Sequence, residues 1–122
     1  MTTPLTIQLS WPAPQLSPNR QQHHMVLHRY KKAAKTEAWA ATKSALSTNH
    51  DWAPAGDLVK LHLIAHPKPT GPHPDADNFI ASCKGFIDGI AKALDINDRD
   101  FEAPTITWAD KCERGKLFVV LS

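Results

Sequence analysis

The sequence predicts a small α+β domain in which a mixed sheet carries two helices on one face, in the order β-α-β-α-β-β. Segments that alternate between apolar and polar residues lie at 5–11 and 57–66, and again at 104–111 and 116–122. Two longer segments, about 26–46 and 78–94, carry apolar residues at helical spacing. A chain of 122 residues is long enough for one domain, which we assign to residues 1–122.

The first half of the chain divides into a strand, an irregular segment, a helix and a second strand. The first strand is followed by a proline-rich segment at 12–19 that ends in S-P-N-R. One face of the first helix carries mostly small residues, namely Tyr30, Ala34, Ala38, Ala41 and Ala45. The second strand leads into a loop at 67–74 that contains four prolines and therefore has few backbone donors.

The last two strands flank the sequence C-E-R-G, which predicts a hairpin with Gly115 in the turn. The two cysteines, Cys83 and Cys112, lack the spacing of a metal site, and Cys83 falls on the apolar side of the second helix. We therefore expect free thiols in a reducing compartment. No segment is long and apolar enough to span a bilayer, and no leader is evident, so the expected location is the cytoplasm.

The second helix and its flanks, residues 74–101, hold most of the chemistry. A helical wheel places the apolar residues on one broad side and Asp77, Lys84 and Asp88 on a narrow polar stripe. A third strip contains only small residues at four-residue spacing, Ala81, Gly85, Gly89 and Ala93. Glycine costs about 1 kcal/mol against alanine in a helix interior, so this strip indicates close packing.

Two aspartates, Asp75 and Asp77, stand one residue apart just before this helix. Such a pair places hard oxygen ligands close together, which suits Mg²⁺ with its retained waters and substrate phosphates. Asp98 is the best candidate for a further ligand, and the metal would activate a water for attack on a phosphodiester. Lys84, surrounded by carboxylates, is better suited to clamp a phosphate than to act as a base. The alternative is that the aspartates cap the helix and that Lys84 pairs with Asp88.

The charge is unevenly distributed, although the formal net charge is only +2. Residues 1–74 carry eight Lys/Arg against three Asp/Glu, whereas residues 75–122 carry six against nine. A basic half beside an acidic cluster is typical of a metal-using enzyme that acts on polyanions, and equally of a solvated surface. Our candidates for contact with DNA are Asn19, Arg20, Arg29, Lys32, Lys35 and Lys68.

The D-A-D-N sequence, the helical K…D-G-I that follows and the later N-D-R-D-F resemble the RusA family of Holliday junction resolvases, found in bacteria and their phages. The segment W-P…L-S-P-N-R resembles the family's proline-rich segment after its first strand. The resemblance covers about residues 5–120. It implies a homodimeric, Mg²⁺-dependent endonuclease that resolves four-way DNA junctions by paired nicks in recombination and repair. The family's three essential aspartates would fall on Asp75, Asp77 and Asp98, and its lysine on Lys84.

Two features depart from the family pattern, in which the lysine follows the D-x-D-N asparagine by three residues. That position is Ala81 here, and Lys84 lies about one helical turn further on. The loop before Asp75 is rich in proline rather than arginine. Two other functions stay open: a metal-dependent phosphohydrolase of nucleotides, and a non-catalytic module that binds DNA or a protein partner.

The length of the second helix bears on how the site is assembled. A straight helix over 78–94 is about 25 Å long, and the four residues from Asp95 to Asp98 reach back about 14 Å at most. Either the helix breaks at Gly85 or Gly89, or Asp98 contributes to the metal site of a second subunit. We favour a homodimer through the small-residue strip, with Asp75 and Asp77 from one chain and Asp98 from the other. The alternative is that the strip packs on the alanine-rich first helix of the same chain.

Overall fold

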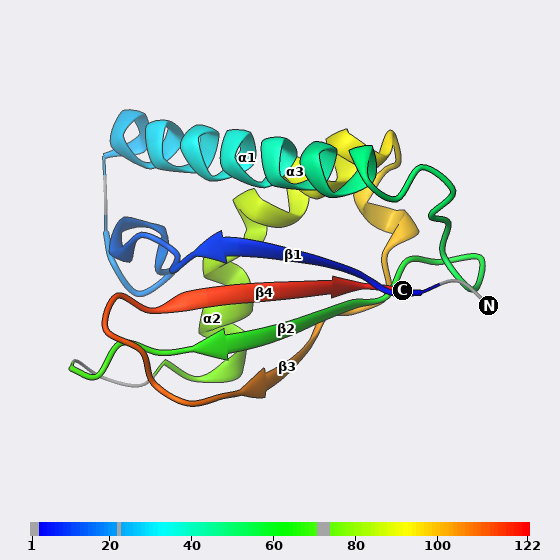
Figure 1. Cartoon of the computed structure of the whole chain (residues 1–122). Coiled ribbons are helices and arrows are strands. Elements are labelled where there is room, and N and C mark those ends of the chain that lie inside the picture. Colours follow the sequence, from blue (N-terminus) through cyan, green and yellow to red (C-terminus); the bar gives the residue numbers. More distant parts are fainter. Residues whose placement is uncertain (1–2, 22, 71–73) are drawn as a thin grey trace.

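The structure, a computed structural model, describes residues 3–21, 23–70 and 74–122. Residues 71–73 of the predicted proline-rich loop lie outside that part. Four strands form one sheet, and three α-helices accompany it (Figure 1). The elements are β1 (Leu5–Ser10), η1 (Pro14–Leu16), α1 (His24–Ser47), β2 (Leu61–His66), α2 (Ala76–Ser82), α3 (Lys84–Leu94), η2 (Asp98–Asp100), β3 (Thr105–Trp108) and β4 (Lys116–Leu121). The predicted α+β class and element order are confirmed, with the second helix divided into α2 and α3.

The sheet has the strand order β1-β4-β2-β3 and is mixed. β4 pairs antiparallel with both β1 and β2, while β3 pairs with β2 in parallel. The predicted hairpin between the last two strands is therefore wrong, because β2 lies between them. Gly115 does lie in a turn, with a φ of 69° and its N–H bonded to the Cys112 carbonyl at 3.1 Å.

The central strand β4 and the edge strand β3 differ in burial. Leu117, Val119 and Leu121 of β4 are almost completely buried. β3 has only half-buried and exposed residues, two of which are threonines. The connection from β3 to β4 passes across the end of β2, where the Ala109 and Cys112 N–H groups donate to the Ala65 and Pro67 carbonyls.

The core lies on one face of the sheet, as the alternating sequence predicted. Leu5, Ile7 and Leu9 of β1 are buried while the residues between them are exposed. In Figure 1, α2 lies behind the sheet, α1 runs along its upper side, and α3 lies beside α1. Cys83 is completely buried in this core, as its place on the apolar side predicted, and desolvation raises the pKa of its thiol to about 12. The thiol therefore stays neutral near pH 7 and acts as a small apolar side chain.

The small-residue strip of α3 packs against α1 of the same chain. A Cβ built on Gly85 would lie 3.1 Å from both the Ala34 Cβ and the Lys31 carbonyl oxygen. A Cβ on Gly89 would overlap the Lys35 carbonyl oxygen. The predicted homodimer through the helix that carries Gly85 and Gly89 is therefore wrong, because α1 already occupies that surface. The alternative, packing on the alanine-rich first helix, is confirmed.

In the part of the chain that the structure describes, no helix combines the length and the hydropathy needed to cross a membrane.

Candidate functional site

The predicted second helix breaks at Cys83, two residues before the first glycine of the strip. Cys83 ends α2 with φ −89° and ψ 1°, and α3 starts at Lys84. The hydroxyl of Ser82, the residue before Cys83, donates to the Asn78 carbonyl one turn back at 3.0 Å. A hydroxyl that bonds the carbonyl four residues back competes with the helix ladder and often bends the helix. The break changes the direction of the chain, so the single polar stripe predicted for Asp77, Lys84 and Asp88 is not continuous.

Asp75 is the N-cap of α2. Its Oδ1 accepts a hydrogen bond from the Asn78 N–H at 2.8 Å, and its Oδ2 accepts one from Asn78 Nδ2 at 3.0 Å. The capping role that the sequence left open is thus present. A carboxylate offers about four lone-pair sites, so each oxygen retains capacity for a further ligand. Asp77 lies in the first turn of α2 and is exposed.

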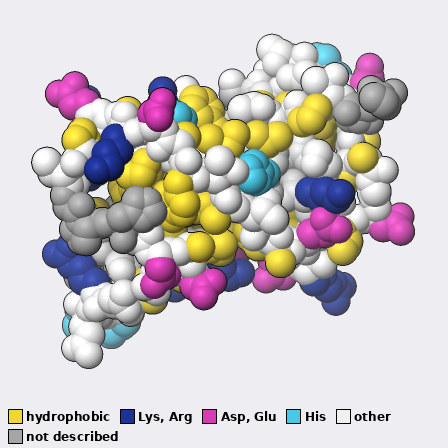
Figure 2. Space-filling model, turned by 90° about the horizontal axis from the view of Figure 1, so that it is seen from below, with side chains coloured by type: hydrophobic (Ala, Val, Ile, Leu, Met, Phe, Trp, Pro, Cys, Tyr) yellow, Lys and Arg dark blue, Asp and Glu magenta, His cyan; other side chains and the backbone are white. Residues whose placement is uncertain are grey.

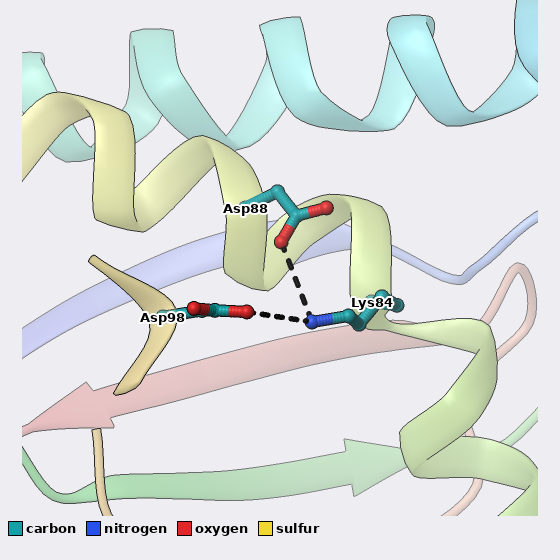
Figure 3. A network of polar contacts seen from close by, with 3 residues as sticks. All are labelled: Lys84, Asp88 and Asp98. Carbon is teal, nitrogen blue, oxygen red and sulfur yellow. Dashed lines mark ion pairs between the residues drawn. The ribbon is translucent and has the colours of Figure 1, made fainter. Parts of the chain in front are cut away.

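Lys84 lies between two carboxylates at the start of α3 (Figure 3). Its Nζ is 3.6 Å from Asp88 Oδ1 and 3.5 Å from Asp98 Oδ2. The side chains of Lys84 and Asp98 are 55% and 64% exposed, so this pair adds at most about 1 kcal/mol to stability. The reversal of the chain between the end of α3 and η2 thus brings two of the sequence-predicted site residues into contact within one chain.

The turn that carries Asp98 is held by neighbouring residues that the sequence analysis did not single out. α3 ends at Leu94, and its C-cap Asp95 has a φ of 57°; η2 then begins with a capping box between Asn97 and Asp100. In this box the Asn97 N–H donates to Asp100 Oδ2 at 2.9 Å. The Asp100 carbonyl accepts from the Val59 N–H at 2.8 Å, which ties the turn to the start of β2. The capping-box pattern N-x-x-D was visible in the sequence.

The donor chemistry of Asp75 and Asp77 fits Mg²⁺, but the three predicted ligands do not form a closed cage. Among the described residues, no group of three or more His, Cys, Asp and Glu side chains is placed to hold a metal ion. Mg²⁺ needs only one or two carboxylates when waters and substrate phosphates complete its shell. The pair Asp75 and Asp77, and Asp98 as a third ligand, stay predictions.

The predicted DNA-binding residues fall into two groups. Asn19, Arg20 and Lys68 line one pocket beside α2, together with Lys111, which the sequence analysis missed. Lys111 is remote in sequence from the other three and carried no motif, so only the strand order brings it there. Arg29, Lys32 and Lys35 are exposed on the N-terminal half of α1.

Comparisons with known proteins give a relative without an assigned activity. No protein-family model matches the chain. An uncharacterised protein of Xylella fastidiosa, strain Temecula1, is 29% identical over 121 residues, which cover 96% of this chain and 75% of that protein. This similarity extends over nearly the whole domain, so it includes both the α2–α3 site and the basic pocket, and it adds no function to either.

Proposed function

We propose that the chain is a cytoplasmic, Mg²⁺-dependent endodeoxyribonuclease of the RusA type, which nicks four-way DNA junctions in recombination and repair. The observation that supports this most directly is the contact between Lys84 and Asp98. The family resemblance assigned roles to these two residues from separate parts of the sequence, and the fold places them 3.5 Å apart on an exposed surface.

In this proposal the chain's own residues position the phosphodiester. Lys84 clamps a non-bridging phosphate oxygen with its ammonium group, and Asp98 and Asp88 hold that group in place. Asp75 and Asp77 would hold Mg²⁺, which would supply positive charge against the charge that develops on the phosphate. Paired nicks need two sites, so two copies would associate through a surface other than the Gly85–Gly89 strip.

The direct test incubates a labelled four-way junction and a linear duplex of the same sequence with Mg²⁺ or with EDTA. We expect Mg²⁺-dependent nicking of the junction in preference to the duplex. Lys84→Ala should slow nicking by about 100-fold or more, since removal of one charge-stabilising group has a cost of that order. Lys92→Ala is the matched control, because Lys92 is an exposed lysine two turns further along α3.

The junction assay and an assay of free-nucleotide turnover together distinguish the other two functions. Turnover of free nucleotides without junction nicking would identify a phosphohydrolase. Junction binding without nicking would identify a DNA-binding module. The absence of both nicking and binding would contradict DNA as the substrate.

The basic half of α1 gives an independent prediction about DNA affinity. Replacing Arg29, Lys32 and Lys35 together by glutamine should weaken junction binding and flatten its dependence on salt. Each lost phosphate contact removes about 0.9 from the log–log slope on duplex arms. Lys43→Gln, in the C-terminal half of the same helix, is the control. A triple variant with the wild-type slope would show that α1 faces solvent rather than DNA.

A further inference from the structure

A pocket of about 390 Å³ lies beside α2, at the end of the sheet where β1 and β2 finish. Its walls come from the segment after β1, from the loop after β2 and from one face of α2. Figure 2 shows hydrophobic surface gathered in the left half of that view, with both basic and acidic side chains at its margins. This volume lies in the range of small-molecule sites in proteins.

The apolar part of the pocket contains two aromatic rings that contact each other. Trp11 and Phe79 both line it, with ring centroids 4.8 Å apart and ring planes 41° apart. Phe79 is buried and also contacts Trp108, with ring centroids 5.2 Å apart. Trp11 also packs against Gly115, where a Cβ would lie 3.0 Å from the Trp11 side chain. These contacts hold the Trp11 indole in one orientation at the edge of the pocket.

The charged part of the pocket is entirely cationic among the residues that the structure describes. Arg20, Lys68 and Lys111 line it, and no Asp or Glu does. A second, shallower hollow shares Trp11 and Lys68 with it. That hollow adds Arg114 and Lys116 and likewise has no acidic residue in its described lining. The basic side chains therefore extend from the first pocket into the second hollow, past the Trp11 and Phe79 rings. Such a row of positive charges suits a ligand with repeated negative charge.

We propose that this pocket binds one unpaired nucleotide of a single strand, with the base against Trp11 and the flanking phosphates on Arg20, Lys68 and Lys111. An aromatic platform in a basic groove is the usual arrangement for single-stranded nucleic acid, because every base offers a π-face. A base within a duplex offers no free face, so the ligand is an unpaired nucleotide. The inference rests on the proposed function only in taking DNA as the source of the strand, since binding here requires neither metal nor cleavage.

The test compares two fluorescein-labelled DNA strands of equal length in EDTA. One is oligothymidine, and the other has the same backbone with an abasic site at every position. The two carry equal charge, so any difference in affinity comes from the bases. Stacking of one base is worth about 1–3 kcal/mol, so wild-type protein should bind the thymidine strand about 5- to 150-fold more tightly.

The variants locate that preference. Trp11→Ala should bring the thymidine strand down to the affinity of the abasic strand and leave the abasic affinity unchanged. Trp39→Ala, at an exposed tryptophan of α1 outside the pocket, should keep the full preference. Replacing Lys68 and Lys111 together by alanine should weaken both strands equally and reduce the salt slope by about 0.7 for each lysine.

Equal affinity of the wild-type protein for the two strands would overturn the proposal, whether or not Trp11→Ala folds. Tighter binding of polyglutamate than of the thymidine strand at matched charge would also overturn it and would assign these basic residues to an acidic protein. Base preference without junction nicking would support the pocket and contradict the nuclease. Nicking without base preference would support the nuclease and contradict the pocket.

Discussion

The Gly89→Ala variant is expected to unfold at a much lower urea concentration than the wild-type protein. On helix propensity alone this substitution would stabilise α3 by about 1 kcal/mol. In the structure, however, the new Cβ would overlap the Lys35 carbonyl oxygen and lie 3.0 Å from the Ala38 Cβ. Because the overlap is with backbone, the helices must separate, and we expect a net loss of about 2 kcal/mol or more.

The control for this prediction is Gly56→Ala. No atom lies within 4 Å of a Cβ built at Gly56, so alanine there should leave the free energy of unfolding within about 0.5 kcal/mol of wild type. Urea titrations followed by circular dichroism give both values. A Gly89→Ala protein as stable as wild type would mean that α1 and α3 are not packed backbone to backbone.

The largest expected effect on activity is that of removing one carboxylate from the α2 pair. Asp77→Asn and Asp75→Asn should each abolish junction nicking while leaving junction affinity unchanged or higher. A lost metal ligand removes the chemistry, whereas a lost negative charge near phosphates reduces repulsion. Asparagine is as good an N-cap as aspartate, so Asp75→Asn should retain the fold.

Nicking rates and equilibrium binding, measured on the same junction, check this prediction. Asp57→Asn, at an exposed acid away from α2, is the control and should nick at the wild-type rate. Nicking close to wild type by either the Asp75 or the Asp77 variant would remove that aspartate from the site.

The periodic elements could be predicted from the sequence because each depends on its own residues. The alternation in 5–11 and the alanine face of 26–46 determined which sides face the core, and Ala34 and Ala38 are buried as expected. The strand pairing could not be predicted from adjacency in sequence. β3 and β4 are adjacent in sequence, but β2 lies between them in the sheet. Burial along each strand does not decide this order, because the edge strand β1 has as many buried residues as the central strand β4.

The candidate site was predicted at the level of residues but not of their arrangement. The sequence showed that Gly85 and Gly89 need a close neighbour, but the neighbour's identity depends on tertiary packing. The break at Cys83 coincides with a local hydrogen bond of Ser82, which a helical wheel does not represent. The contact between Lys84 and Asp98 depends on the chain reversal after α3, which periodicity does not show either.

The place of β4 in the sheet has a consequence for how the chain folds. β1 and β2 have no contact as neighbours until residues 116–121 insert between them and pair with both. Most pairing in the sheet therefore joins residues that are far apart in sequence, which makes folding slow compared with that of a helical domain. During synthesis β1 and β2 leave the ribosome with their edges unpaired, and the helical layer has no complete sheet to cover. The domain thus closes only after its last strand has been made.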